Sequence, residues 1–223
     1  MVNREPVISV RGEALLEVEP EIAIVNVIIQ ARDRDRQTVL SRLTSRNQQV
    51  TSVIKGYGEA VEKVESGPAS VRPDIISKKA GERVSAYVGR ASSQVTVRDF
   101  TVLGELVANL SDGDLVTVTG PSWALRPDSA VYRDARLAAA RDAQVRAREY
   151  AQAFGGSISG LIEAADAGLL SAPGSSTTYV GRASGRTLGF TGGESQAELD
   201  FEPAKQTVSA QVEARFALTV QEN

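Results

Sequence analysis

The ten residues from Ile22 to Ala31 constrain the fold of this chain more than any other segment. Asn26 and Gln30 are the only polar residues among them, so apolar side chains fall on both alternating faces of an extended strand. A strand with one solvated face shows a regular alternation of apolar and polar residues, and this segment does not. We therefore predict a strand that is buried, at least in part, on both faces.

Other segments alternate between helix-like and strand-like patterns. Apolar residues at helical spacing predict helices over about 35–57, 100–110 and 129–154. Asp99 is a suitable N-cap for the second of these helices. Strand-like runs lie over 7–18, 61–77, 84–98, 115–125, 161–165 and 207–220. The predicted order is therefore β-β-α-β-β-α-β-α-β-β.

Pairs of strands precede the first two helices, unlike the regular alternation of strands and helices in a doubly wound sheet. We predict an α+β fold, in which helices pack on one face of an antiparallel or mixed sheet. Two β-β-α units are expected at 7–57 and 61–110, within a single domain over 1–223. Residues 168–196 are rich in Gly and Ser and lack apolar periodicity, which predicts a long loop.

The third predicted helix carries small residues along one face. At 100° per residue, this face holds Tyr132, Ala135, Ala139, Ala143, Ala147, Tyr150 and Phe154. Small side chains let a helix lie close to a sheet. Arg136 falls within the same stripe, so we consider a buried or interface ion pair for it. The alternative is a side chain that reaches solvent past the edge of the stripe.

The chain contains no histidine and no cysteine. This excludes Ser-His-Asp catalysis, thiolate nucleophiles and metal sites that use His or Cys ligands. Carboxylate, Lys, Tyr and Ser chemistry remains open. We predict a protein without enzymatic activity, catalytic residues, cofactor or metal, and keep a carboxylate-based hydrolase as a remote alternative.

Three local patterns resemble functional motifs, and each has a plainer interpretation. Ser77 and Lys79 can share a strand face as a Ser–Lys dyad, but a solvated turn is favoured. Four glutamates between residues 13 and 21 offer oxygen ligands for Ca²⁺ or Mg²⁺, but a solvated strand face is favoured. Trp123 and Tyr132 can line a ligand pocket, but packing in the core is favoured.

The net charge of −3 argues against nucleic-acid binding, because neutralisation of phosphates supplies most of the affinity of such proteins. No segment approaches the ~18 consecutive apolar residues of a membrane helix. The N-terminal residues also lack the apolar core of a signal peptide. We therefore expect a cytoplasmic protein without a membrane span, or an envelope protein if a leader has been removed.

Several segments, taken in order, resemble the SIMPL-domain family. Near the N-terminus they are Ile8-x-Val10-x-Gly12-Glu13-Ala14 and Val18-Glu19-Pro20-Glu21-Ile22-Ala23. The alanine-spaced helix with its exit at Phe154-Gly155 matches as well, as does the final strand through Val208-Ser209-Ala210. The resemblance covers nearly the whole chain apart from the loop at about 168–196. One departure is Glu21, where members usually have Asp.

The resemblance implies a bacterial protein with no established enzymatic activity and no defined catalytic residues. It also implies assembly into oligomers and, in some members, a link to oxidative or other stress resistance. We therefore expect a non-enzymatic, self-associating protein that acts as a scaffold or in stress protection. The alternative is a small-molecule or peptide binding module that uses the groove between sheet and helices.

The long loop offers apolar residues for contact with a second copy or another protein. Its part from Leu169 to Gly181 is uncharged. The candidate interaction residues, in the loop and on the long helix, are Arg136, Tyr179, Val180, Leu188 and Phe190.

Overall fold

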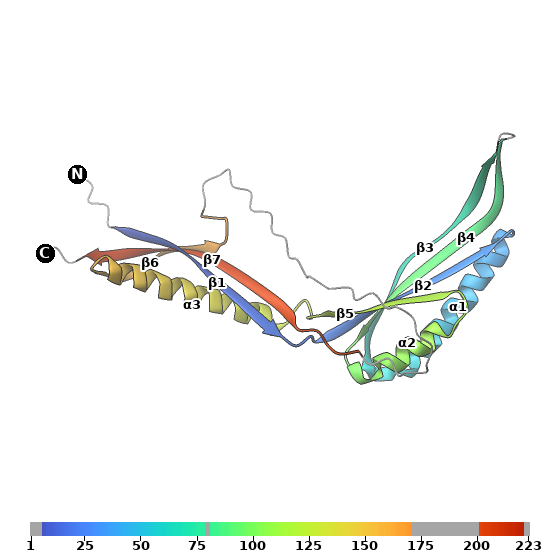
Figure 1. Cartoon of the computed structure of the whole chain (residues 1–223), viewed down its shortest axis with the longest axis horizontal. Coiled ribbons are helices and arrows are strands. Elements are labelled where there is room, and N and C mark those ends of the chain that lie inside the picture. Colours follow the sequence, from blue (N-terminus) through green and yellow to red (C-terminus); the bar gives the residue numbers. More distant parts are fainter. Residues whose placement is uncertain (1–5, 79–80, 171–200, 221–223) are drawn as a thin grey trace. The chain divides into compact units, whose positions relative to one another are not determined.

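The computed structural model describes residues 6–78, 81–170 and 201–220 of the chain (Figure 1). They divide into two compact units that are built from interleaved segments. Of the described residues, unit 1 takes 6–18, 126–170 and 205–220. Unit 2 takes 19–125, apart from the gap at 79–80, and the short stretch 201–204. The predicted α+β class and order of elements are confirmed, but the strands form two sheets.

Unit 1 is an antiparallel three-stranded sheet with one helix. Its strands are β1 (Val7–Val18), β6 (Gly156–Asp166) and β7 (Gln206–Val220), in the order β1-β7-β6. The helix α3 (Ala130–Ala153) packs mainly on β1 and β7 (Figure 1). Alternate strand residues such as Ile8, Val10 and Phe216 form a small core with the alanines of α3.

A ridge of alanines lets α3 approach the sheet closely. Ala135, Ala139, Ala143, Ala147 and Ala151 are buried at every fourth position. A Cβ added to Gly12 of β1 would lie 2.0 Å from the Ala139 carbonyl oxygen, so backbone meets backbone there. The predicted place of the aromatic residues on this face is wrong, because large rings would hold the helix away from the sheet. The exposed aromatic side chains are those of Tyr132, Tyr150 and Phe154.

Unit 2 is an antiparallel four-stranded sheet with two helices on one face. Its strands are β2 (Ile22–Asp33), β3 (Val61–Lys78), β4 (Gly81–Val97) and β5 (Val116–Ala124), in the order β3-β4-β2-β5. The helices are α1 (Arg36–Gly56) and α2 (Leu103–Ser111), and short 3-10 turns lie at Gly58–Ala60 and Phe100–Val102. Large aliphatic side chains from both helices and from β2 and β4 form one core.

The helix starts in unit 2 follow from local hydrogen bonds. Asp99 accepts from the backbone N–H of Thr101, as its predicted capping role requires, and Asp35 accepts from that of Thr38. The predicted hairpin over 61–98 is also confirmed, since β3 and β4 pair along their length. Ile24 and Ile28 are half-buried on the face of β2 that lies away from the helices, in keeping with its two-sided apolar pattern.

The expected β-β-α unit over 7–57 is wrong. β1 pairs with β7, from Val7 opposite Ala217 to Val18 opposite Gln206, and β2 pairs with β4 and β5 in the other sheet. Pro20 separates the two strands in the sequence, and the chain passes from one sheet to the other there. The apolar pattern of each strand indicates which of its faces is buried, but it does not specify which strand is the neighbour.

Candidate functional site

The face of the unit 1 sheet that lies away from α3 carries an ordered set of ionic side chains. Arg11 on β1 stands directly opposite Glu213 on β7, and its Nη2 donates to Glu213 Oε1 over 2.8 Å. Arg215 lies two residues along β7, and its Nη1 donates to Glu163 Oε2 of β6 over 3.2 Å. These four side chains, Arg11, Glu163, Glu213 and Arg215, are called here the Arg–Glu cradle.

The cradle holds the backbone of the segment that follows β6. The N–H of Leu170 donates to Glu213 Oε2 over 3.2 Å, and Arg215 Nη2 donates to the Leu170 carbonyl oxygen over 3.1 Å. Gly168 has a φ of 89°, a left-handed conformation that glycine adopts without strain and that turns the chain back over the sheet. The cradle therefore binds a short stretch of main chain through both its donor and its acceptor.

Glu213 is the electrostatic centre of this site. Its side chain is 11% exposed. The hydrogen bond from Arg11 lowers the pKa of Glu213, burial acts in the opposite direction, and the N–H groups of Gly168 and Leu170 lower it further. A cavity of about 310 Å³ lies beside it, bordered by Ser9, Arg11, Leu170 and Arg215. An ionised, hydrogen-bonded carboxylate between two guanidinium groups suits the binding of polar groups.

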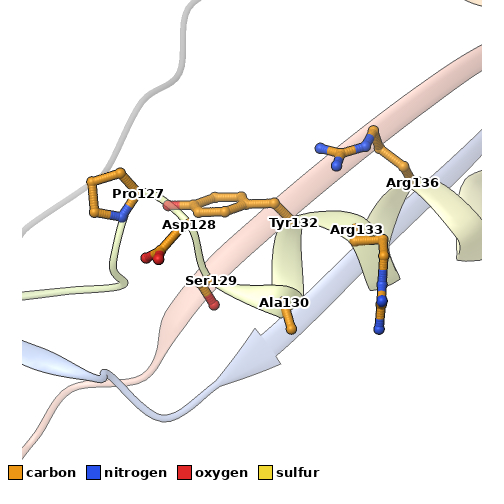
Figure 2. A pocket seen from close by; sticks show the side chains of 7 residues that line it. All are labelled: Pro127, Asp128, Ser129, Ala130, Tyr132, Arg133 and Arg136. Carbon is orange, nitrogen blue, oxygen red and sulfur yellow. The ribbon is translucent and has the colours of Figure 1, made fainter.

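A second cavity, of about 430 Å³, lies at the start of α3 (Figure 2). Ser129 caps the helix there by accepting from the N–H of Val131 over 3.3 Å. Figure 2 shows the Tyr132 ring pointing back toward Pro127, while Arg133 and Arg136 leave the helix on different sides. Ser129 is buried, whereas Pro127, Tyr132, Arg133 and Arg136 are exposed.

Arg136 is the one predicted interaction residue that lies in the described part of the chain. A buried ion pair is wrong for it, because Arg136 is exposed and its neighbour Ala135 takes the buried position. Successive residues of a helix are rotated by ~100°, so at its own level of the helix Arg136 projects to the side of the buried alanine face. A role at an interface stays a prediction.

Other sequence candidates are not brought together. Tyr179, Val180, Leu188 and Phe190 lie outside the described residues, as do the side chains of Ser77 and Lys79. The ring of Trp123 packs against Phe100, with centroids 4.9 Å apart, in the core of unit 2. Tyr132 belongs to unit 1. Over 6–78, 81–170 and 201–220, acidic side chains form no group that could hold a metal ion.

The model of one protein family matches residues 8–216, a range that spans nearly the whole chain and both units. The chain belongs to the SIMPL family. That family is described as a protein of unknown function, DUF541, so membership supplies a fold-level relationship and no activity. No protein of curated function matches the sequence. Among the described helices, none is both long enough and apolar enough to cross a membrane.

The two edges of the unit 1 sheet in this SIMPL protein differ. At the β1 edge, α3 lies over Gly12, and Asp142 of that helix accepts the outward N–H of Glu13 over 2.9 Å. At the other edge, every residue of β6 is at least partly exposed. Leu161 is 59% exposed and Ile162 is 53% exposed. A single helix, ~10 Å wide, covers about two strands that are spaced ~4.8 Å apart.

Reasoning from the sequence missed both the cradle and the exposed strand. The charges of the cradle come from β1, β6 and β7, which are far apart in the sequence, and only the register brings Arg11 opposite Glu213. One sequence feature does point to the cradle. Charged residues occupy alternate positions on strands whose other positions are apolar. The sequence also could not state that α3 covers β1 and β7 and leaves β6 open.

Proposed function

We propose that this SIMPL protein acts through self-association, as a scaffold and without catalysis. The observation that supports this most directly is the uncovered strand β6, on which Leu161 and Ile162 lie next to each other at a sheet edge and are both exposed. Adjacent exposed aliphatic residues on an edge strand are a feature that soluble proteins tend to avoid or to cover. A second copy of the chain is the cover we propose.

Each exposed aliphatic side chain contributes a modest free energy to such a contact. Burial of a Leu or Ile side chain contributes about 1.5–3 kcal/mol, which is roughly tenfold or more in a dissociation constant. Register shifts flank Leu161, between Ile158 and Gly160 and again between Leu161 and Glu163. Because bulges disfavour open-ended pairing of strands, contact through side chains fits β6 better than continued addition of strands.

Lysine substitutions at the two exposed positions test the proposal. Leu161→Lys and Ile162→Lys place a charge where apolar contact is expected, so each variant should dissociate at a concentration about tenfold or more above that of the wild type. Val145→Lys is the matched control, because Val145 is also exposed, at 48%, but projects from α3. Sedimentation velocity over a range of concentrations measures the effect.

The result is decisive when folding is monitored in parallel. All three positions are exposed, so the melting temperatures should stay close to that of the wild type. The proposal is wrong if the β6 variants assemble as the wild type does, or if Val145→Lys disrupts assembly equally. The absence of catalysis is part of the same proposal, and it rests on the missing His and Cys rather than on any measured activity.

The Arg–Glu cradle favours a second candidate function, the binding of an extended peptide. Glu213 and Arg215 already hold the N–H and the carbonyl oxygen of Leu170, contacts that any peptide backbone can offer. We propose the face opposite α3 for this binding, in place of the groove between sheet and helix, because the backbone contact at Gly12 closes that groove along this stretch. Peptides that bind the wild type and fail to bind Arg215→Ala in fluorescence anisotropy would support this function, and equal binding would contradict it.

A further inference from the structure

Three arginines gather on one face of unit 2, where β2, β3 and β4 run side by side. Val88 of β4 pairs with Arg32 of β2 on one side and with Arg72 of β3 on the other. Arg90 lies two residues along β4, and so is diagonal to both. Gly89, between them, faces Val39 and Leu43 of α1, so the three arginines project from the opposite face. They are called here the arginine triangle.

The triangle is short of counter-charges. Arg32 Nη2 meets Asp74 Oδ2 over 2.6 Å across β4. Arg72 and Arg90 are exposed, and neither has an ion-pair partner within the described part of the chain. One carboxylate against three guanidinium groups leaves a surplus of two positive charges. Guanidinium groups gathered with too few carboxylates create a positive potential at this face, so it should attract an anionic partner.

One face of the unit 1 sheet carries a surplus of negative charge. Glu13 and Glu17 of β1 project from the same face as the Arg–Glu cradle, and both are exposed. The cradle is balanced within itself, with two arginines and two glutamates. The carboxylates of Glu13 and Glu17 have no partner in the described residues, so this face carries a surplus of two negative charges. The two faces therefore carry surplus charges of opposite sign and equal number.

On each face the two surplus charges lie near each other. Glu13 and Glu17 are four residues apart on one strand, about 13 Å, and Arg72 and Arg90 are diagonal neighbours on adjacent strands, about 7–8 Å apart. Both faces belong to sheets, and none of the described helices covers either of them. We propose, on the basis of the proposed self-association, that the arginine triangle of one copy docks on the Glu13 and Glu17 face of a second copy. This contact is head-to-tail, because it joins two different surfaces, and it extends an assembly beyond a pair.

Charge reversal on each face, singly and together, tests the contact. Arg72→Glu and Glu17→Arg should each weaken assembly beyond the pair by about tenfold or more, since each opposes like charges. The double variant Arg72→Glu/Glu17→Arg should restore much of the wild-type assembly, because the charges match again with reversed signs. Arg141→Glu, an exposed arginine on α3, is the matched control and should change nothing. Sedimentation velocity at low and at physiological salt gives the distribution of sizes.

The outcomes separate this contact from self-association itself. A wild type that stays monomeric contradicts the proposed function, and with it this inference. A wild type that assembles, with single variants unchanged in size, overturns only the arginine–glutamate contact. Single variants that weaken assembly without recovery in the double variant also overturn it, since the arginine would then act on some other anionic partner. Loss of assembly in the single variants and recovery in the double variant support it.

Discussion

The two units solve the problem of covering a sheet in different ways. In unit 2, α1 and α2 place branched aliphatic side chains such as Val39, Leu103 and Leu106 against the sheet, all of them fully buried. In unit 1, α3 uses alanine at each buried position and approaches until it meets the backbone of β1 at Gly12. Unit 2 therefore relies on side-chain volume and unit 1 on close contact of backbones.

This difference explains where each unit is open. Helices with large side chains bury a wide area, and two of them cover four strands. One narrow alanine helix covers β1 and β7, so β6 stays exposed and the charged cradle holds the opposite face. The surfaces proposed for contact with a second copy therefore follow from the way unit 1 is packed.

The largest effect is expected for Gly12→Ala. Its new Cβ would lie 2.0 Å from a backbone oxygen of α3, which cannot move without moving the helix, so unit 1 should lose several kcal/mol or fail to form. Gly89→Ala is the matched control. Its Cβ meets side-chain atoms of Val39 and Leu43 at 2.5 and 2.6 Å, and side chains shift at a lower cost than a helix backbone does.

The readout for this pair is the single tryptophan, Trp123, which packs in the core of unit 2. Gly12→Ala should lower the far-UV circular dichroism and keep the Trp123 fluorescence of the wild type. Gly89→Ala should cost unit 2 about 1–3 kcal/mol. Equal destabilisation of unit 1 and unit 2 by Gly12→Ala would show that the two kinds of packing are not separable.

A smaller effect is expected when buried side chains are shortened. Leu106→Ala should destabilise unit 2 by about 2–5 kcal/mol, because it removes a fully buried side chain and leaves a cavity. Ala139→Gly removes the equivalent contact in unit 1 and should cost about 1 kcal/mol, mostly through helix propensity. Chemical denaturation followed by circular dichroism and by Trp123 fluorescence compares the two. If Ala139→Gly destabilised unit 1 as much as Leu106→Ala destabilises unit 2, this would contradict the claim that unit 2 relies on side-chain volume and unit 1 on close contact of backbones.

The smallest effect concerns the cradle and depends on pH. Because Arg11 lowers the pKa of Glu213 in the folded state, the ionised carboxylate stabilises the fold at pH values above its unfolded pKa. This contribution is lost as the pH falls through the folded pKa. Glu213→Gln should therefore cost unit 1 about 1–2 kcal/mol at neutral pH. The difference in unfolding free energy between Glu213→Gln and the wild type should become smaller as the pH is lowered. A difference that stays constant with pH would contradict this role of the Glu213 carboxylate.

Periodicity allowed the order and approximate bounds of the helices and strands to be predicted, because local apolar spacing determines them. Four of the five buried alanines of α3, all but Ala151, were predicted for the same reason. The outward turn of Tyr132, Tyr150 and Phe154 was not, because it depends on how closely the helix approaches the sheet and not on helical spacing alone.

The pairing of strands was beyond prediction from the sequence. Val7 pairs with Ala217, more than two hundred positions along the chain, and no local pattern specifies that partner. The cradle and the arginine triangle depend on register in the same way, since Arg11, Arg72 and Arg90 acquire their neighbours only across strands. The sequence could suggest candidate residues only within single segments, whereas each polar cluster of this fold combines residues from different strands.

Sedimentation velocity of the wild-type chain, at concentrations from about 1 to 100 μM, tests the central claim most directly. Self-association at micromolar strength corresponds to about 8 kcal/mol of binding free energy, which the exposed β6 residues and the charged faces together are proposed to supply. The account predicts a concentration-dependent shift to species larger than the 23.7 kDa chain. A single species of 23.7 kDa at every concentration would contradict it.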